Sequence, residues 1–186
     1  MHPNAKCWLG ITGRWPATVL GVVLMLGGCG KGPRAPGLED GPVFVDAREG
    51  LRFLVPQKWV QTARGVMPPG RLEQERMIVD YKITGTAKPA SFRVTCIDLA
   101  DGANIPKYVV KEAPSGWHMK GPPKAIEVHG MLATRTALTG PDQYAREVVA
   151  FRRGERVYLF TGIWAASDHS AREQIEHAIE SVILEN

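Results

Sequence analysis

The feature that most constrains the fold of this chain is an apolar run near its C-terminus, "VYLFTGIW", residues 157–164. Successive side chains of a β-strand point to opposite faces. Here both faces are apolar, with Val157, Leu159 and Ile163 on one and Tyr158, Phe160 and Trp164 on the other. A strand that is apolar on both faces lies inside a sheet that is covered on both sides. The sequence therefore predicts a sheet with packed elements on each face.

Strand patterns precede this run along the chain. In residues 51–55, apolar side chains alternate around Arg52, and Pro56 ends the segment. Further strands are predicted at residues 76–83, 91–96, 125–129, 131–138 and 144–153. A turn near Gly130 joins two of these strands, and a turn at Arg153-Gly154 joins the last of them to the apolar run.

Two segments are predicted to be helices. The first is short, with Asn104 as its N-cap and Pro114 as a barrier to its continuation. The second has apolar residues at helical spacing, and Ser167, or Ser170 with Glu173, is its predicted cap. Its apolar stripe consists of Ile175, Ala178, Ile179, Val182 and Ile183. Because the strands are joined by hairpin-length links, we expect an α+β fold, an antiparallel β-sheet flanked by helices.

The N-terminal segment has the character of a leader. Lys6 and Arg14 provide positive charge, and residues 15–27 are apolar but shorter than the roughly 20 residues that span a bilayer. The apolar run ends in Gly27-Gly28-Cys29. The alternative is an uncleaved leader, or a buried helix with a chance cysteine.

This order of charge, apolar run, small residues and cysteine resembles the lipobox signal peptide of bacterial lipoproteins. The resemblance implies cleavage between Gly28 and Cys29, a diacylglycerol on the Cys29 sulfur and a fatty acid such as palmitate on the new amino terminus. Two or more acyl chains give lasting membrane attachment. Gly30, where an Asp tends to retain lipoproteins in the inner membrane, favours the periplasmic face of the outer membrane.

The chain is accordingly divided into three parts. Residues 1–28 are the predicted signal peptide, and residues 29–42 are the predicted lipidated cysteine and a flexible tether. Four glycines and three prolines within residues 30–42 give that tether little to bury. Residues 43–186 form one predicted globular domain.

The globular part resembles the PsbP-like family. The segment "DAREGLRFLVPQKWV", residues 46–60, is similar to that family's opening strand, and residues 130–164 with "IEHAIESVIL", residues 175–184, are similar to its closing half. The resemblance implies an α/β/α sandwich around an antiparallel sheet and a role in binding or scaffolding other proteins. Its motifs are packing signatures rather than catalytic residues. The photosystem and Ran-binding roles of some members do not transfer, because a shared fold does not imply a shared task.

Charge argues against a nucleic-acid partner. Of the 23 basic residues, Lys6 and Arg14 lie in the leader, which leaves 21 against 19 acidic residues, a formal charge of +2. A nucleic-acid-binding domain is expected to carry a basic stripe. The cluster Arg152, Arg153 and Arg156 is interpreted as a solvated hairpin turn.

No catalytic or metal site is predicted. Asp168, His169 and Ser170 are consecutive, so in a helix their side chains diverge and do not form a proton relay. His169, Glu173 and His177 share a helical face that in principle holds a metal, and a solvated polar face is the alternative. We therefore predict a non-enzymatic protein with no cofactor and no metal.

Loop segments offer the remaining candidate sites. Residues 112–124 place Trp117 and Met119 among prolines and glycines, a candidate recognition loop, although Trp117 is also expected to cover a sheet edge or core rim. Met67, in residues 64–71, is a second candidate of this kind, with the same structural alternative. Cys96 lies in a strand pattern and is expected to be a buried, inert thiol. Trp59 and Trp164 are expected in the core.

Three functions remain open from the sequence. The first is an anchored domain that binds or scaffolds an unidentified envelope protein. The second is a lipoprotein that binds a small ligand between sheet and helix, although the sequence shows no convergent charged set. The third is a metal-assisted hydrolase built on His169, Glu173 and His177.

Overall fold

The structure is a computed structural model that describes residues 42–185. The predicted signal peptide, its cleavage site, Cys29 and all of the tether except Pro42 lie outside the described residues. Within residues 42–185, neither helix is both long and apolar enough to cross a membrane.

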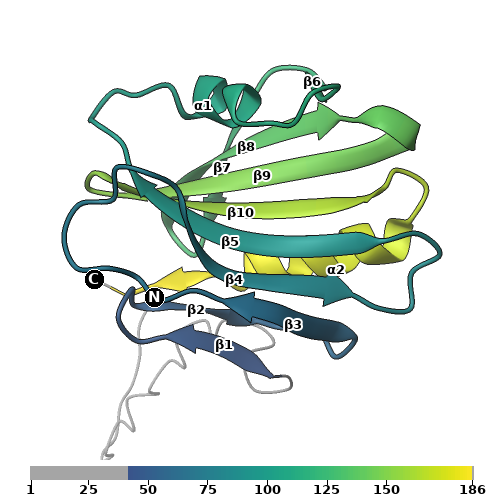
Figure 1. The fold of residues 1–186 in the computed structure, drawn as a ribbon, viewed down its shortest axis with the longest axis horizontal. Coiled ribbons are helices and arrows are strands. Elements are labelled where there is room, and N and C mark those ends of the chain that lie inside the picture. Colours follow the sequence, from purple (N-terminus) through teal and green to yellow (C-terminus); the bar gives the residue numbers. More distant parts are fainter. Residues whose placement is uncertain (1–41, 186) are drawn as a thin grey trace, which may run out of the picture. The chain divides into compact units, whose positions relative to one another are not determined.

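A large antiparallel sheet of eight strands is the centre of the domain (Figure 1). Its strands are β3 (Trp59–Arg64), β4 (Arg76–Ile83), β5 (Ala90–Asp98), β6 (His118–Met119), β7 (Lys124–Val128), β8 (Met131–Thr139), β9 (Tyr144–Arg153) and β10 (Arg156–Ala165). They are ordered β3-β4-β5-β10-β9-β8-β6, and β7 also pairs with β8. The outer edge of β8 is thus shared by two short strands.

A second, smaller sheet contains β1 (Val43–Asp46), β2 (Leu51–Leu54) and β11 (Ile183–Leu184), in the order β1-β2-β11. β11 begins at Ile183, which the apolar stripe assigned to the C-terminal helix. The helix ends earlier, so Ile183 pairs with Arg52 of β2 instead. The sequence pattern is continuous there because the helix and the following strand bury apolar residues in the same core.

The helices agree with the predicted positions but one cap differs. Asn104 caps α1 (Ile105–Lys111) and accepts a hydrogen bond of 2.9 Å from the backbone nitrogen of Lys107. The predicted serine caps of α2 (His169–Glu180) are wrong, because Asp168 accepts the hydrogen bond from Ala171 at 2.9 Å. Ser170 lies inside the first turn, where its backbone is already helical. A short 3-10 turn, η1 (Pro141–Gln143), connects β8 to β9.

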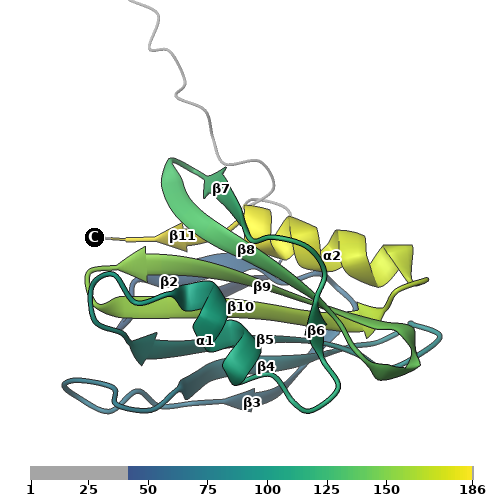
Figure 2. The same cartoon turned by 90° about the horizontal axis from the view of Figure 1, so that it is seen from above.

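Two apolar cores lie on opposite faces of the large sheet, which confirms the prediction from residues 157–164. α2 and the small sheet cover one face, and α1 covers the other (Figures 1 and 2). Tyr158 and Phe160 belong to the first core, and Val157 and Leu159 belong to the second. The antiparallel α+β class is confirmed, and the small sheet is an addition that the sequence analysis did not separate.

α2 approaches the sheet closely at Gly162. A Cβ atom on Gly162 would lie 2.6 Å from the Cγ2 atom of Ile175, well inside van der Waals contact. A residue without a side chain is therefore required on this part of β10. The helix packs its apolar stripe here, and Ala171, Ile175, Ala178 and Ile179 are all buried.

The two predicted hairpin turns are present. β7 and β8 turn at His129 and Gly130, whose φ angles of 49° and 79° are both positive, as a two-residue turn with the mirror-image geometry requires. β9 and β10 turn at Gly154 and Glu155, and the φ angle of Gly154 is 61°.

The interpretation of the arginines at this second turn as solvated is wrong. Arg156 donates to both oxygens of Glu49 at 3.1 Å and to both oxygens of Asp98 at 2.8 and 3.0 Å. Tyr158 donates its hydroxyl hydrogen to Glu49 at 2.9 Å, and Arg153 donates to the Tyr158 hydroxyl oxygen. Glu49 is 4% exposed, so this network of Glu49, Asp98, Arg153, Arg156 and Tyr158, the hairpin clasp, is buried at its centre.

The third arginine is also engaged. Arg152 donates to the carbonyl oxygen of Leu99 at 3.0 Å and lies 3.6 Å from a carboxylate oxygen of Asp101. The sequence places three cations around a turn, but Arg152 and Arg156 have acceptors 53 and 107 positions away along the chain, and Arg153 donates to the carbonyl oxygen of Glu185, 32 positions away. Such distant partners have no local sequence signal.

Candidate ligand pocket

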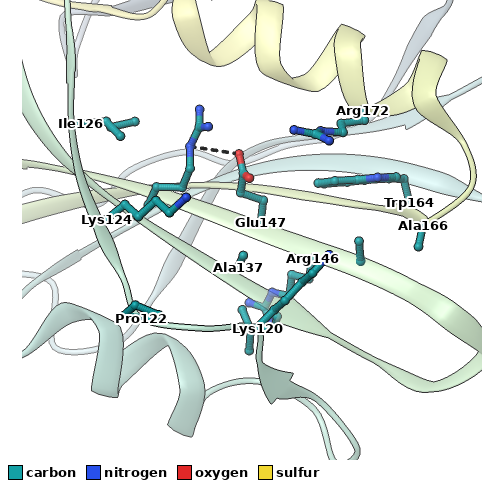
Figure 3. A pocket seen from close by; sticks show the side chains of 13 residues that line it. Lys120, Pro122, Lys124, Ile126, Ala137, Arg146, Glu147, Trp164, Ala166 and Arg172 are labelled. Atoms are coloured by element: carbon teal, nitrogen blue, oxygen red, sulfur yellow. Dashed lines mark ion pairs between the residues drawn. The ribbon is translucent and has the colours of Figure 1, made fainter.

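A cavity of about 330 Å³ opens where β8 changes its edge partner. Residues 131–135 of β8 pair with β7, whereas Leu138 and Thr139 pair with β6. The chain leaves β6 and crosses to β7 through a Gly-Pro-Pro segment, residues 121–123. Prolines lack a backbone N–H group and do not pair as a strand does. The pairing along this edge is therefore interrupted between Arg135 and Ala137, and Figure 3 shows the side chains that line the cavity there.

The floor of the pocket is the face of the sheet that carries α2. Ala137 of β8 lies opposite Glu147 of β9, and Ala145 of β9 lies opposite Trp164 of β10. Residues that face each other in an antiparallel pair point to the same side, so these four share one face. Trp164 is buried, which confirms its expected place in the core, and its exposed edge contributes apolar surface to the cavity.

The walls are mostly cationic. Lys124 and Ile126 of β7 lie on one side of Glu147, and Trp164 and Arg172 lie on the other (Figure 3). Lys124 is opposite Arg135 in the β7–β8 pair, so both project to the pocket face. The remaining lining residues include Lys120, Pro122, Leu138, Arg146 and Ala166.

Lys120 belongs to the same face of the sheet. Its backbone nitrogen donates to the carbonyl oxygen of Ala137 at 2.8 Å, which continues the β6–β8 pairing by one residue. Lys120 is exposed, as are Lys124 and Arg172. Four cations, Lys120, Lys124, Arg135 and Arg172, thus line one cavity together with the buried carboxylate of Glu147.

Glu147 is the central polar group of the pocket. It is 8% exposed, and its Oε1 atom lies 3.4 Å from the Nε atom of Arg135, the pair drawn as a dashed line in Figure 3. Burial raises the pKa of Glu147 above its ordinary value, and the charge of Arg135 acts in the opposite direction. A carboxylate whose pKa is raised in a cavity is a recurring property of ligand sites.

Arg146 also lines the cavity, although it leaves β9 on the face opposite to Glu147. Burial lowers the pKa of Arg146, and its Nε atom has no hydrogen-bond partner among the described residues. The strand therefore places the cation Arg146 on one face of the sheet and the carboxylate Glu147 on the other, both next to the pocket.

This arrangement is suited to binding an anion. Cations outnumber carboxylates around the cavity, and a volume of about 330 Å³ is at the small end of the range of roughly 300–1,000 Å³ for ligand sites. The sequence shows no convergent charged set, and the structure shows why. Arg135, Glu147 and Arg172 are 12 to 37 positions apart and are brought together only by the β8–β9 pairing and the packing of α2.

The candidate recognition loop is divided by the structure. Trp117 is half-buried and packs against the core beneath α1, with its ring against Gly140. Met119 is 46% exposed and lines a shallow hollow beside α1 with Val110 and Pro123. Trp117 thus covers the rim of the core, as one of its two predicted roles required, and Met119 is the exposed residue of the two.

The remaining sequence candidates do not converge on a site. His169, Glu173 and His177 lie on the exposed side of α2, and no group of three or more metal-binding side chains occurs within residues 42–185. Met67 is buried and its sulfur lies 3.3 Å from that of Cys96. Cys96 is fully buried, as expected, and burial raises its pKa to about 12.

The domain has an α+β fold of the PsbP-like type. The domain is similar to the solution structure of cyanobacterial PsbP (CyanoP) from Synechocystis sp. PCC 6803, with a TM-score of 0.55 and 14% identity over 86% of this chain and 99% of that one. At this identity the likeness shows the fold alone, and it confirms the fold that the sequence resemblance implied.

Two further solved structures are similar to a lesser degree. One is from Bacteroides thetaiotaomicron VPI-5482, with a TM-score of 0.49 and 10% identity over 78% of this chain and 49% of that one. The other is a protein of unknown function, PA94, from Pseudomonas aeruginosa, with a TM-score of 0.48 and 16% identity over 78% of this chain and 97% of that one. No protein-family model and no curated protein matches this chain.

Proposed function

We propose that this chain is a lipid-anchored binding protein of the bacterial cell envelope, with a domain that binds a ligand without catalysing a reaction. The anchor is a diacylglycerol on the sulfur of Cys29. It is attached before the leader is cleaved between Gly28 and Cys29. The order of positive charge, apolar run and small residues before Cys29 supports this anchor. Gly30 supports a final position on the periplasmic face of the outer membrane.

The anchor is tested by metabolic labelling with palmitate. The native chain is expected to take up the label and to fractionate with membranes, because the acyl chains partition into lipid. Cys29→Ser is expected to lose the label and to keep its leader. Cys7→Ser is the matched control and is expected to behave like the native chain. A native chain without label would contradict the anchor.

The binding function rests on one observation, the cationic cavity around Glu147. Three cations of the sheet side and Arg172 of α2 line one cavity with a buried carboxylate, in a space the size of a small ligand site. An anionic ligand offsets the repulsion between those cations, whereas a neutral ligand does not. We therefore place the binding site between β7, β8, β9 and the N-terminal half of α2.

The pocket is tested by calorimetric titration of the purified chain in a non-ionic detergent. Inorganic phosphate and citrate are expected to bind, and neutral glucose is not. The double variant Lys120→Gln/Lys124→Gln is expected to weaken anion binding at least tenfold. Lys107→Gln/Lys111→Gln removes two exposed cations of α1 on the other face and is the control. Failure of every anion to bind the native chain would contradict the site.

A second candidate function, binding of an envelope protein, is favoured by two exposed strand edges. Val45 on β1 and Val60 on β3 are each half exposed, and both strands are at the edges of their sheets. Arg64 donates to the carbonyl oxygen of Val45 at 2.9 Å and links the two edges. Unpaired strand edges accept an extended segment of another protein as an additional strand.

This candidate is tested with a photo-crosslinking residue at position 60. An extended partner segment is expected to give a discrete adduct that is lost when Val45→Pro removes a backbone donor on the adjacent edge. Leu132, exposed at the opposite edge of the large sheet, is the matched control position. The same adducts from positions 60 and 132 would contradict this candidate.

A further inference from the structure

An unused hydrogen-bond donor lies beside an unused acceptor at the base of the pocket. The Nε atom of Arg135 and the Oε1 atom of Glu147 are both buried and 3.4 Å apart, and neither makes a hydrogen bond to any described residue. The two atoms form an ion pair, but they are not aligned for a hydrogen bond, and buried polar atoms without a hydrogen bond are rare. A hydroxyl group has one hydrogen to donate and lone pairs to accept. Both atoms are closed to solvent where they stand, so a ligand hydroxyl reaches them when the two side chains separate, and it then accepts from Arg135 and donates to Glu147.

Two lysines supply charge that the protein itself leaves unpaired. Within residues 42–185, no carboxylate oxygen lies within 4.0 Å of the ammonium group of Lys120 or of Lys124. By contrast, Arg172 is held by Glu176 at 2.9 Å, one turn along α2. Two free ammonium groups next to one cavity match a ligand group with nearly two negative charges. A phosphate monoester carries about −1.5 to −2 at neutral pH.

The remaining surface of the cavity is apolar and small. Trp164, Ile126, Ala137 and Ala145 contribute it, and the volume is about 330 Å³. A few placed polar groups in an otherwise apolar cavity set the orientation of a small ligand. The ligand therefore has a short carbon skeleton that separates its phosphate from its hydroxyl.

We propose that the pocket binds a small phosphate monoester of a polyol. Lys120 and Lys124 bind the phosphate, and Arg135 and Glu147 bind one hydroxyl of the carbon skeleton. This proposal rests on the proposed function of the same pocket and adds the chemical class of the ligand. The two parts make separate demands: the lysines set affinity for the phosphate, and the Arg135–Glu147 pair sets selectivity for a hydroxylated skeleton.

The proposal is tested by calorimetric titration of the full chain in non-ionic detergent with four compounds. Glycerol 3-phosphate has both groups, n-propyl phosphate lacks the hydroxyls and glycerol lacks the phosphate. Glycerophosphoglycerol carries the same hydroxyls on a phosphate diester with a single charge, as in the headgroup of phosphatidylglycerol. Glycerol 3-phosphate is expected to bind at least tenfold more tightly than n-propyl phosphate, and glycerol is expected not to bind.

Variants separate the two parts of the site. Glu147→Ala is expected to bring the ratio of the two phosphate affinities close to one, because the hydroxyl loses its acceptor. Lys120→Gln/Lys124→Gln is expected to weaken both phosphates by tenfold or more and to preserve their ratio. Lys107→Gln/Lys111→Gln, on the far face, is expected to change neither quantity. Circular dichroism of each variant shows that its fold is retained.

The outcomes distinguish this inference from the proposed function. Equal affinity for glycerol 3-phosphate and n-propyl phosphate would overturn the inference and leave the anion site intact. Tighter binding of glycerophosphoglycerol than of glycerol 3-phosphate would also overturn it, because the ligand would then be a singly charged lipid headgroup. Failure of all four compounds, and of phosphate and citrate, to bind the native chain would overturn both.

Discussion

Removal of Arg156 is expected to destabilise this domain strongly, because it leaves two buried carboxylates without their main donor. Its guanidinium makes hydrogen bonds of 2.8 to 3.1 Å to both oxygens of Glu49 and both oxygens of Asp98. The carboxylate side chains are 5% and 8% exposed, so water does not replace the lost donors. Removing one partner of a buried ion pair costs about 3–5 kcal/mol. Arg156→Ala is expected to lower the free energy of unfolding at pH 7 by this amount.

The loss is expected to depend on pH in a definite direction. The hydrogen bonds from Arg156 hold the pKa of Asp98 below its ordinary value, against the effect of burial. A carboxyl group whose pKa is depressed by folding stabilises the fold above its unfolded pKa, about 3.9, and loses that contribution as the pH falls through the folded value. In Arg156→Ala the carboxyl group of Asp98 gains a proton more readily. The difference between native and variant therefore shrinks as the pH falls from 7 towards 3.

Urea unfolding of the purified chain at pH 7 and at pH 3 measures both quantities. Arg71→Ala is the matched control, because Arg71 forms a 4.0 Å pair with Glu155 in which both side chains are more than half exposed. An exposed pair contributes about 0–1 kcal/mol. A loss of less than about 1 kcal/mol at pH 7 for Arg156→Ala, or a loss that is the same at both pH values, would refute the reasoning.

Three further predictions concern packing and reactivity. Gly162→Ala is expected to destabilise the domain by about 1–3 kcal/mol in urea unfolding, because its Cβ would lie 2.6 Å from Ile175, and an unchanged midpoint would contradict this contact. Trp117→Ala is expected to cost about 3 kcal/mol and Met119→Ala less than about 0.5 kcal/mol, so equal losses would contradict the assignment of Trp117 to the core rim. Cys96 is expected to resist alkylation at pH 8 until the domain unfolds, because burial raises its pKa to about 12, and rapid labelling of the native fold would contradict its burial.

Much of the fold could be predicted from side-chain periodicity. The two-faced apolar run of β10 indicated a sheet covered on both sides, and both cores are present. The Asn104 cap and the turns at Gly130 and Gly154 could also be predicted from the sequence, because a cap or a turn depends on a few consecutive residues. The small sheet could not be predicted from the sequence, because β11 has two residues and pairs with a strand some 130 positions earlier.

The candidate site, by contrast, could not be predicted from the sequence. Arg135 lies in β8 and Glu147 in β9, and taken alone each is a polar residue in a strand, with no sign of a binding site. Only the register of β8 on β9 and the position of α2 place them in one cavity. One signal was available, since Glu147 lies in the apolar stretch "REVVAF", residues 146–151, where a carboxylate on a buried strand needs a partner.

The two buried glutamates of the domain show how structure and function divide. Glu49 and Glu147 are 4% and 8% exposed, but Glu49 accepts three hydrogen bonds and Oε1 of Glu147 accepts none from the described residues. Proteins retain unsatisfied buried groups mainly where function requires them, at a cost in stability. This difference supports a structural role for Glu49 and the proposed binding role for Glu147.

Isosteric variants test this division directly. Glu49→Gln is expected to lower the free energy of unfolding at pH 7 by about 3 kcal/mol, because Arg156 loses a charged partner. Glu147→Gln is expected to leave it unchanged or raise it by about 1 kcal/mol, because burial raises the pKa of Glu147 and the ionised form therefore opposes folding at pH 7. Lowering the pH relieves that opposition in the native chain only, so the advantage of Glu147→Gln disappears under acid conditions. A Glu147→Gln variant that is as unstable as Glu49→Gln would show that both carboxylates support the fold. The unsatisfied Glu147 would then no longer be evidence for a binding site in the pocket.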